Sequence, residues 1–448
     1  NQISSSVASF ILLFKSFNLH CNMNNKQLLI LSFISLVAFM HCDKSGMQQN
    51  APVSIFLTSN LVDVDSVELV NFTIPASYDI EGSLAPGTFY GQKRRLAQIQ
   101  EIKDSSRNEP IYWDIKAALV NENHNMFKSE QAQGSENIRT KIDELNFDNG
   151  NTSVADHIAS LADSLVKSSQ ANYLKVANNG IAGMITTGTK KRHVSANGLE
   201  YAEILEKSLY GALLYDQMVD DYLSDSQSGI NNKEGNNVLS AEDYELYGTE
   251  RQHKFDEAFG YFGAEAATYP NQANFSNGDG IFLANYIFDF SDETEAMYGV
   301  NLAKAAMNAF IVGRSVLKAG QGSDSSQENI NEGIFNAARA DIKLYVEAGL
   351  AASAIHYLNE AITDVSEAEK LHHLSEALGF IYAMSFNSEG RLTPEESHTA
   401  LMALDWSATD SSLNGIYDIN LWDITDEQIN MAIDVIDEFF PGFKNAGF

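Results

Sequence analysis

Long stretches of this chain repeat apolar residues at three- and four-residue steps, and this period constrains the fold more than any other feature. Such a stripe buries one face of a helix against its neighbours. In residues 199–224 the stripe consists of Leu199, Ala202, Leu205, Leu209, Ala212 and Leu213. The same period predicts helices near residues 89–106, 154–177, 199–224, 240–263, 293–318, 330–362, 366–386, 395–405 and 425–439. The sequence therefore predicts an all-α protein built of helical bundles.

Strand patterns are scarce by comparison. One β-branched run, "VDSVELVNFTI", indicates a short strand, and we expect little strand beyond residues 60–75. Polar loops are expected at 225–237 and 320–327. Ser195 and Thr425 have the residue types that begin helices. We expect upstream residues and a signal peptide in 1–42, a short non-helical linker in 43–88, a first helical half in 89–270 and a second in 271–448.

The N-terminal region has the layout of an export signal. Met23 is followed by a basic residue, Lys26, and then by an apolar run over residues 28–40. This run is shorter than the ~20 residues that span a bilayer, and it suits the apolar core of a signal peptide. We therefore interpret Met23 as the better start and expect the protein to be exported.

Cys42 follows this run directly. A bacterial lipoprotein signal places its lipidated cysteine there, although Phe39 and His41 stand where a leucine and a small residue are usual. The alternatives are an ordinary signal peptide or an N-terminal anchor. We expect lipid attached to Cys42 to tether the protein to a membrane in the cell envelope.

Charge and cysteine content exclude several classes of function. The chain has 29 basic and 60 acidic residues, a net charge of −31, so nucleic acid is not an expected partner. The two cysteines are Cys21 and Cys42. Beyond residue 42 the sequence therefore excludes disulfides, zinc–thiolate sites and a cysteine nucleophile.

A ten-residue pattern occurs twice. "HKFDEAFGYF" begins at residue 253 and "HHLSEALGFI" at residue 372, so His253 matches His372, and Glu257 matches Glu376. Histidine and glutamate four residues apart share one helix face, and a glycine lies on that face two turns along. If the two helices cross at these glycines, both strips meet between two related halves.

Two interpretations of these strips remain open. Imidazole and carboxylate groups bind iron, zinc or manganese, and bundle cores use such inward sets. The candidate metal ligands are His253, Asp256, Glu257, His372, His373 and Glu376. Alternatively, the first copy is a surface helix whose polar face is solvated, because its aromatic residues lie on the opposite side. The second copy is more apolar all round, so its polar strip needs partners.

Two family resemblances follow from these stretches. "ANGLEYAEILEKSLYGALLYDQMVDDYLSD" and "HKFDEAFGYFGAE", with the lipoprotein-like start, resemble the exported bacterial proteins of domain-of-unknown-function family 4856, over residues 72–448. The helical, exported, His/Glu-bearing layout is also similar to imelysin-like proteins. That resemblance implies two pseudo-symmetric bundles, a G-x-H-x-x-E motif near the groove between them, and a link to iron uptake or peptidase activity. Residues 373–376 fit H-x-x-E, but the preceding glycine is missing.

We expect an exported, lipid-anchored binding protein whose ligand, a metal or metal complex, lies in the groove between the halves. One alternative is a metal-dependent peptidase or hydrolase of imelysin type, and another is a structural surface module without a small ligand. The sequence has no H-E-x-x-H motif, and "GMITTGTKK" reverses the Lys-Ser/Thr order of a phosphate loop. The sequence shows no evident catalytic nucleophile.

Overall fold

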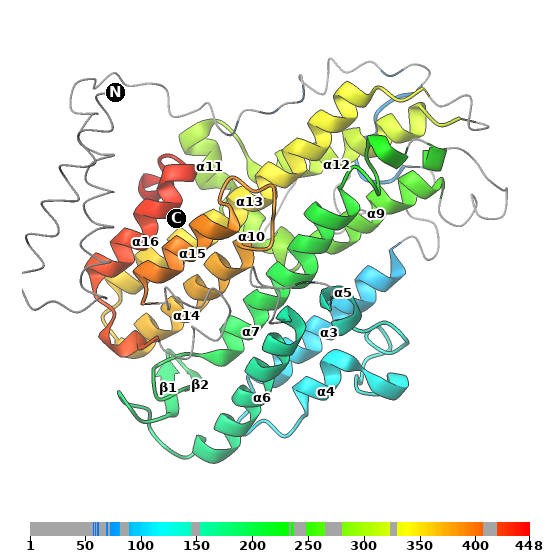
Figure 1. Cartoon of the computed structure of the whole chain (residues 1–448). Helices are drawn as coiled ribbons and strands as arrows, with labels where there is room; N and C mark the ends of the chain where they lie inside the picture. Colours follow the sequence, from blue (N-terminus) through cyan, green and yellow to red (C-terminus); the bar gives the residue numbers. More distant parts are fainter. Residues whose placement is uncertain are drawn as a thin grey trace, which may run out of the picture. The chain divides into compact units, whose positions relative to one another are not determined.

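Helices make up most of the described chain, as the apolar period predicts (Figure 1). The computed structural model describes residues 57, 59, 61, 69, 72–80, 89–143, 145, 153–232, 234–236, 248–264, 280–322, 329–405 and 419–448. Its α-helices are α3 (Tyr90–Ser106), α4 (Ile115–Val120), α5 (Arg139–Ile142), α6 (Val154–Asn172), α7 (Tyr201–Leu209), α9 (Glu250–Phe262), α10 (Leu283–Asp289), α11 (Ser291–Tyr298), α12 (Leu302–Ala319), α13 (Glu332–Thr363), α14 (Glu367–Met384), α15 (Pro394–Ala403) and α16 (Asp426–Phe439). The predicted all-α class is confirmed.

Shorter elements complete the chain. Two π-helical segments follow α7, η4 (Tyr210–Tyr215) and η5 (Gln217–Tyr222). Single 3-10 turns are η3 (Glu122–His124), η6 (Ile230–Asn232), η7 (Glu234–Asn236), η11 (Leu421–Asp423) and η12 (Phe443–Asn445). The two strands are β1 (Gly183–Thr187) and β2 (Lys190–Val194). In the described part of the chain, no helix is both long enough and apolar enough to cross a membrane.

The long helix α13 packs against α12, α14 and α10, and α14 packs against α7 and α15 (Figure 1). The middle turns of α13 are buried on every side, because small residues such as Gly349 and Ala352 let neighbouring helices approach closely. Residues Ser54–Phe448 group as one compact unit. The boundary expected at residue 270 lies outside the described residues, so the division into two related halves stays a prediction.

Capping residues set several helix ends where the sequence places them. Thr425 accepts a hydrogen bond from Gln428 N, and the Gln428 side chain accepts one from Thr425 N in return, which is a capping box. The helix start predicted at Thr425 is therefore confirmed. The start predicted at Ser195 is wrong. Its hydroxyl accepts from Leu199 N and closes a turn, and α7 begins only at Tyr201.

The helix predicted over 293–318 is two helices. Gly299 ends α11 with a φ of 71°, a left-handed conformation that glycine adopts without a steric penalty. Asn301 then caps α12 by accepting from Lys304 N. The break lies inside an otherwise continuous apolar period. The helix-ending glycine and the capping asparagine therefore determine the helix boundaries here, and the apolar period does not.

The helix predicted over 199–224 continues past α7 as two π-helical segments. Here the backbone of Gly211 approaches α14 so closely that a Cβ at this position would lie 2.5 Å from Ala383 Cα. Every residue from 201 to 219 is buried, rather than one stripe of them. Tertiary packing therefore overrides the regular helical period in this segment.

One hairpin was missed by the sequence reasoning. β1 and β2 pair antiparallel, with Thr187 opposite Lys190, so two residues form the turn. Gly188, the first turn residue, has a φ of 57°, which favours glycine in a two-residue hairpin turn. The stretch rejected as a phosphate loop is therefore a strand–turn–strand unit. The run predicted as a strand before residue 75 lies mostly outside the described residues.

Candidate functional site

Asp256 of α9 is fully buried, not solvated as the surface-helix interpretation expected. Its carboxylate lies 2.9 Å from Arg314 Nε of α12, and Tyr78 donates a hydrogen bond of 2.6 Å to it. Burial raises the pKa of this carboxyl group in spite of the Arg314 charge. Asp256 joins α9 to α12 in the core, and its position gives no support for a metal-ligand role.

His253 and Glu257, on the same helix, are partly buried. Glu257 accepts from Gln92 Nε2 of α3 at 2.8 Å and lies 3.1 Å from Lys254 Nζ. Its distance to His253 Nε2 is 3.8 Å. Burial lowers the pKa of His253, so the imidazole is neutral near pH 7. Glu257 therefore forms a polar contact between α9 and α3, and His253 lies beside it on α9.

The expectation that the two repeat helices cross at their glycines is wrong. A Cβ on Gly260 would lie 2.7 Å from Phe89 and 2.9 Å from Gln92, at α3. A Cβ on Gly379 would instead lie 2.6 Å from the Lys207 side chain, on α7. Each glycine does allow a close approach, but to a different helix. The position of each glycine in the repeat correctly predicted a close helix contact. It could not identify which helix makes that contact.

The second strip does have buried partners. His372 Nδ1 of α14 lies 2.8 Å from a Glu200 carboxylate oxygen, and its Nε2 lies 3.3 Å from Glu376. Ser375 accepts a hydrogen bond from Glu200 N at 3.0 Å. His373 points elsewhere and lies 2.8 Å from Asp364. The expectation that a polar strip on this buried helix needs partners is confirmed.

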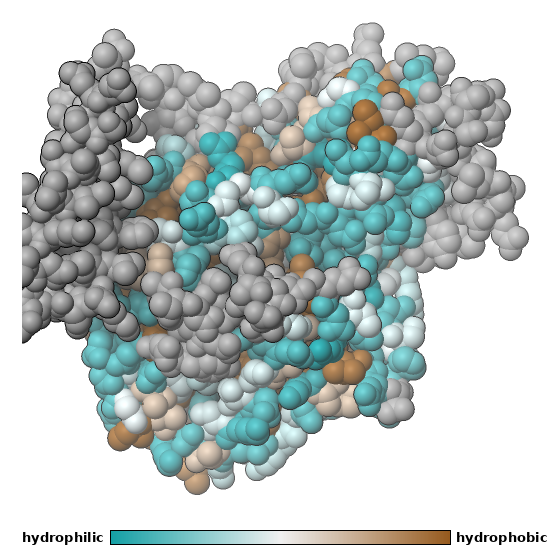
Figure 2. Space-filling model, viewed as in Figure 1, coloured by the Kyte–Doolittle hydropathy of each residue, from teal (hydrophilic) through white to brown (hydrophobic). Residues whose placement is uncertain are grey.

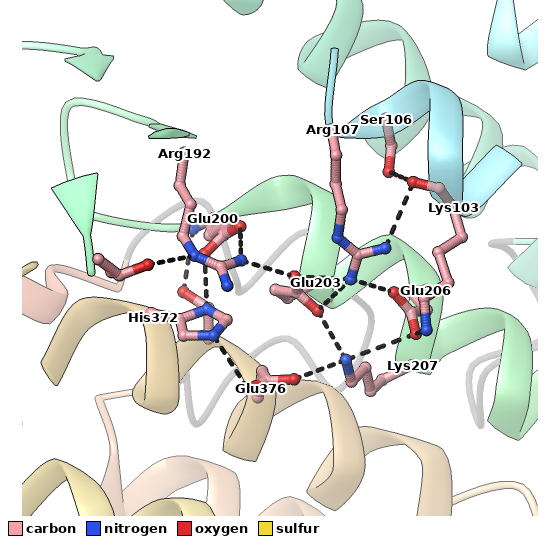
Figure 3. A network of polar contacts seen from close by, with 12 residues as sticks. Lys103, Ser106, Arg107, Arg192, Glu200, Glu203, Glu206, Lys207, His372 and Glu376 are labelled. Carbon is pink, nitrogen blue, oxygen red and sulfur yellow. Dashed lines mark hydrogen bonds and ion pairs between the residues drawn. The ribbon is translucent and has the colours of Figure 1, made fainter. Parts of the chain in front are cut away.

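These contacts belong to a larger network of charged side chains (Figure 3). Lys207 Nζ of α7 lies 2.6 Å from Glu203 and 2.8 Å from Glu376. Arg107 Nη2, just after α3, lies 2.8 Å from Glu203. We call this set the charge cluster, and its members are Lys103, Arg107, Arg192, Glu200, Glu203, Glu206, Lys207, His372 and Glu376.

Opposite charges outweigh the effect of burial on the pKa values of Glu203, Lys207 and His372. Burial alone would raise the pKa of Glu203, but Lys207 and Arg107 hold that pKa well below its usual range. Burial would lower the pKa of Lys207, and the surrounding glutamates raise it well above its usual value. Burial also opposes protonation of His372, but its hydrogen bond to Glu200 raises the pKa. Four carboxylates thus face four permanent cations, and the network is balanced.

The hairpin brings Arg192 to the charge cluster. Arg192 Nη1 lies 3.0 Å from Glu200 and 3.1 Å from Glu203. Its Nε donates to Thr187 Oγ1 of β1 at 2.7 Å. The strand that sequence reasoning missed therefore supplies one of the four cations and holds its guanidinium group in a fixed orientation.

A pocket of about 240 Å³ opens beside the charge cluster, between the hairpin and the end of α3. Its lining carries more positive than negative charge, in a chain whose net charge is −31. The lining residues are Ser106, Arg107, Asn108, Glu109, Lys190, Lys191, Arg192, His193, Glu200 and Ala202. Burial lowers the pKa of His193 to about 4, so this histidine is neutral near pH 7.

The charge cluster contains residue types that can bind a metal ion. Ligand atoms of Glu200, Glu203 and His372 lie within 4.8 Å of one another, and those of His372, His373 and Glu376 do so as well. These residue types suit iron, zinc or manganese. However, Glu200 and Glu203 already bind the guanidinium of Arg192. A divalent ion would therefore have to displace a cation of the chain itself.

The three glutamates at the start and along α7 were the main residues that the sequence reasoning missed. Glu200, Glu203 and Glu206 recur every three residues beside an apolar stripe, and Lys207 lies four residues after Glu203. That spacing places all of them on neighbouring parts of one helix surface. Three charged residues on α7, with a fourth, Glu200, just before it, among so many apolar neighbours are the signal that could have identified the site.

Comparison with known proteins gave one finding. A family model described as "Domain of unknown function (DUF4856)" matches residues 75–441. Neither the curated proteins nor the solved structures gave a match.

Proposed function

The chain belongs to the DUF4856 family, whose description assigns no activity. From the geometry of its pocket we propose that the protein binds a small anionic ligand. Its lining supports this proposal, since Arg107, Lys190, Lys191 and Arg192 converge there in a strongly acidic chain. A carboxylate or phosphate group is the chemistry that such donors recognise.

The charge cluster would position the two arginines of this pocket. Arg192 is held through Nη1 and Nε, and its Nη2 makes no hydrogen bond with any described residue. Arg107 is held by two glutamates through Nη2. Guanidinium groups fixed on one edge lose little conformational entropy when the other edge binds a ligand. The buried carboxylates would thus serve binding indirectly.

Binding of two probe anions, inorganic phosphate and citrate, tests this proposal by titration calorimetry on the full chain. Lys190 and Lys191 are exposed and carry no ion pair with a described residue, so replacing them should leave the fold intact. We expect the double variant Lys190→Ala, Lys191→Ala to weaken binding of the better probe by about fivefold or more. The matched control replaces Lys116 and Lys128, two exposed lysines outside the pocket.

Two results would contradict the anion-binding proposal. If neither probe binds, or if the control variant weakens binding as much as the pocket variant, the pocket does not select anions. A loss confined to the pocket variant supports the proposal, because both variants remove the same two charges from the chain.

Metal binding is the second candidate, and the close approach of Glu200, Glu203 and His372 favours it. These residues would hold iron, zinc or manganese as a Lewis acid or a structural ion. Metal analysis of the purified chain, with His372→Gln beside the exposed-histidine control His124→Gln, tests it. Metal present in the control and lost from His372→Gln supports this candidate, and a metal-free wild type ends it.

Export and a lipid on Cys42 remain part of the proposal. The apolar run of residues 28–40 and the cysteine after it support this, and both lie outside the described residues. Nothing in the described part of the chain adds support for the imelysin-type peptidase alternative. Palmitate labelling of the wild type and of Cys42→Ser tests the anchor, and equal labelling of both would contradict it.

A further inference from the structure

Residues 164–199 contain no aspartate or glutamate and five basic residues, in a chain where acids outnumber bases two to one. This acid-free segment runs from the second half of α6 through the hairpin to the turn before α7. Three of its basic residues, Lys190, Lys191 and Arg192, line the pocket, and Lys175 lies outside that lining, in the loop before β1.

The same segment exposes large apolar side chains. Leu174 is 82% exposed, Val176 is 76% exposed and Ile181 is 50% exposed. Single exposed apolar residues are ordinary, but three within eight positions form a group. Figure 2 shows hydrophobic surface at the lower left, in the region where Figure 1 places β1, β2 and the loop before them.

Backbone hydrogen bonds hold this group in place. Met184 N of β1 donates to Lys175 O at 2.8 Å, and Ala177 N donates to Met184 O at 3.1 Å. Residues 175–177 therefore run beside β1 as β2 does on its other side. Lys175 is exposed between Leu174 and Val176. The apolar side chains and the lysine are thus presented together on ordered backbone.

We propose that residues 174–181 dock on a lipid surface that carries anionic headgroups. The exposed apolar residues are aliphatic, which suits the boundary between headgroups and acyl chains, and Lys175 would meet the lipid phosphates. Residues 164–199 themselves add no carboxylate to this surface, where Asp423 is a neighbouring acid that accepts a hydrogen bond from Asn179 Nδ2 at 3.1 Å. The contact uses residues outside the pocket lining, so it is independent of the proposed anion ligand.

A site-specific probe tests the contact on the full chain. The chain has two cysteines, so Cys21→Ser with Cys42→Ser removes both thiols and the site of lipid attachment. A polarity-sensitive fluorophore on Ile181→Cys should shift to shorter wavelength with vesicles containing about one-third phosphatidylglycerol in phosphatidylcholine. The same fluorophore on Val365→Cys, at a fully exposed position in the turn between α13 and α14, should not shift. This comparison excludes a signal from the N-terminal apolar run.

Lys175→Gln should weaken the vesicle titration about fivefold, and 0.5 M salt should weaken it further. The proposal is overturned if Ile181→Cys shows no shift, if Val365→Cys shifts equally, or if pure phosphatidylcholine vesicles give the same titration. It is also overturned if the shift occurs without vesicles as protein concentration rises, since the surface would then bind a second copy of the chain.

Discussion

Removing the ammonium group of Lys207 should test the balance of the charge cluster directly. Its side chain is 1% exposed, and its Nζ lies 2.6 Å from Glu203 and 2.8 Å from Glu376. Lys207→Met keeps much of the apolar stem and leaves two buried carboxylates without their shared cation. Removing one partner of a buried ion pair costs about 3–5 kcal/mol, so we expect a loss of that size in the free energy of unfolding.

The chain contains a matched control for this variant. Lys167 lies 2.5 Å from Asp163 with the same i,i+4 spacing, but the two side chains are 74% and 37% exposed. Exposed helix pairs of this kind contribute about 0.3–0.5 kcal/mol. Lys167→Met should therefore be nearly neutral, and the two variants should differ by about 60-fold or more in the unfolding equilibrium.

Urea unfolding followed by circular dichroism measures both variants. Adding Glu376→Gln to Lys207→Met should recover part of the loss, because one uncompensated carboxylate is removed, and this non-additivity identifies a shared interaction. If Lys207→Met lowers the free energy of unfolding no more than Lys167→Met does, water or a counter-ion must neutralise or solvate the carboxylates of Glu203 and Glu376. The interpretation of the network as a closed, balanced core would then be refuted.

Three further variants probe packing and titration. Gly211→Ala should lower the free energy of unfolding by about 1–3 kcal/mol, because its Cβ would lie 2.5 Å from Ala383 Cα. The control Gly333→Ala has ordinary space around its Cβ and should not destabilise the protein. Equal effects of the two variants in urea unfolding would contradict the packing argument. Burial raises the pKa of Glu347 from its usual 4.5 to about 7, so wild type should lose stability relative to Glu347→Gln as pH rises from about 4.5 to about 7. Burial lowers the pKa of His193 to about 4, so wild type should lose stability relative to His193→Gln as pH falls from about 6.5 to about 4. Urea midpoints over pH 4–7.5 measure both effects, and parallel curves for a variant and wild type would contradict them.

The helical class follows from local patterns, and the structure confirms it wherever the period was long. The segment predicted at 366–386 is α14, and that at 330–362 is α13. These helices have strong caps and apolar residues on several faces, so local and tertiary preferences agree. The predicted helix at 293–318 was wrong at Gly299, where a two-residue signal mattered more than the surrounding period.

The candidate site was predictable in part. His372 and Glu376 were identified because histidine and glutamate four residues apart on an apolar helix need partners, and both lie in the charge cluster. Their partners Glu200 and Lys207 were not identified, since they lie about 170 positions away in the sequence. Periodicity describes which face of a helix is buried, but it contains no information about which other helix covers that face.

His253 and His372 show the same division between sequence and tertiary structure. The sequence by itself determined that each begins an i,i+4 strip beside a glycine that admits a close neighbour. Only the tertiary structure decided that Gly260 meets α3 and Gly379 meets α7, and so which strip contacts Lys207 and the glutamates at α7. Helix formation depends on residues within one or two turns, whereas a buried ion network depends on the packing of distant segments, and a single sequence specifies that packing only through the whole fold.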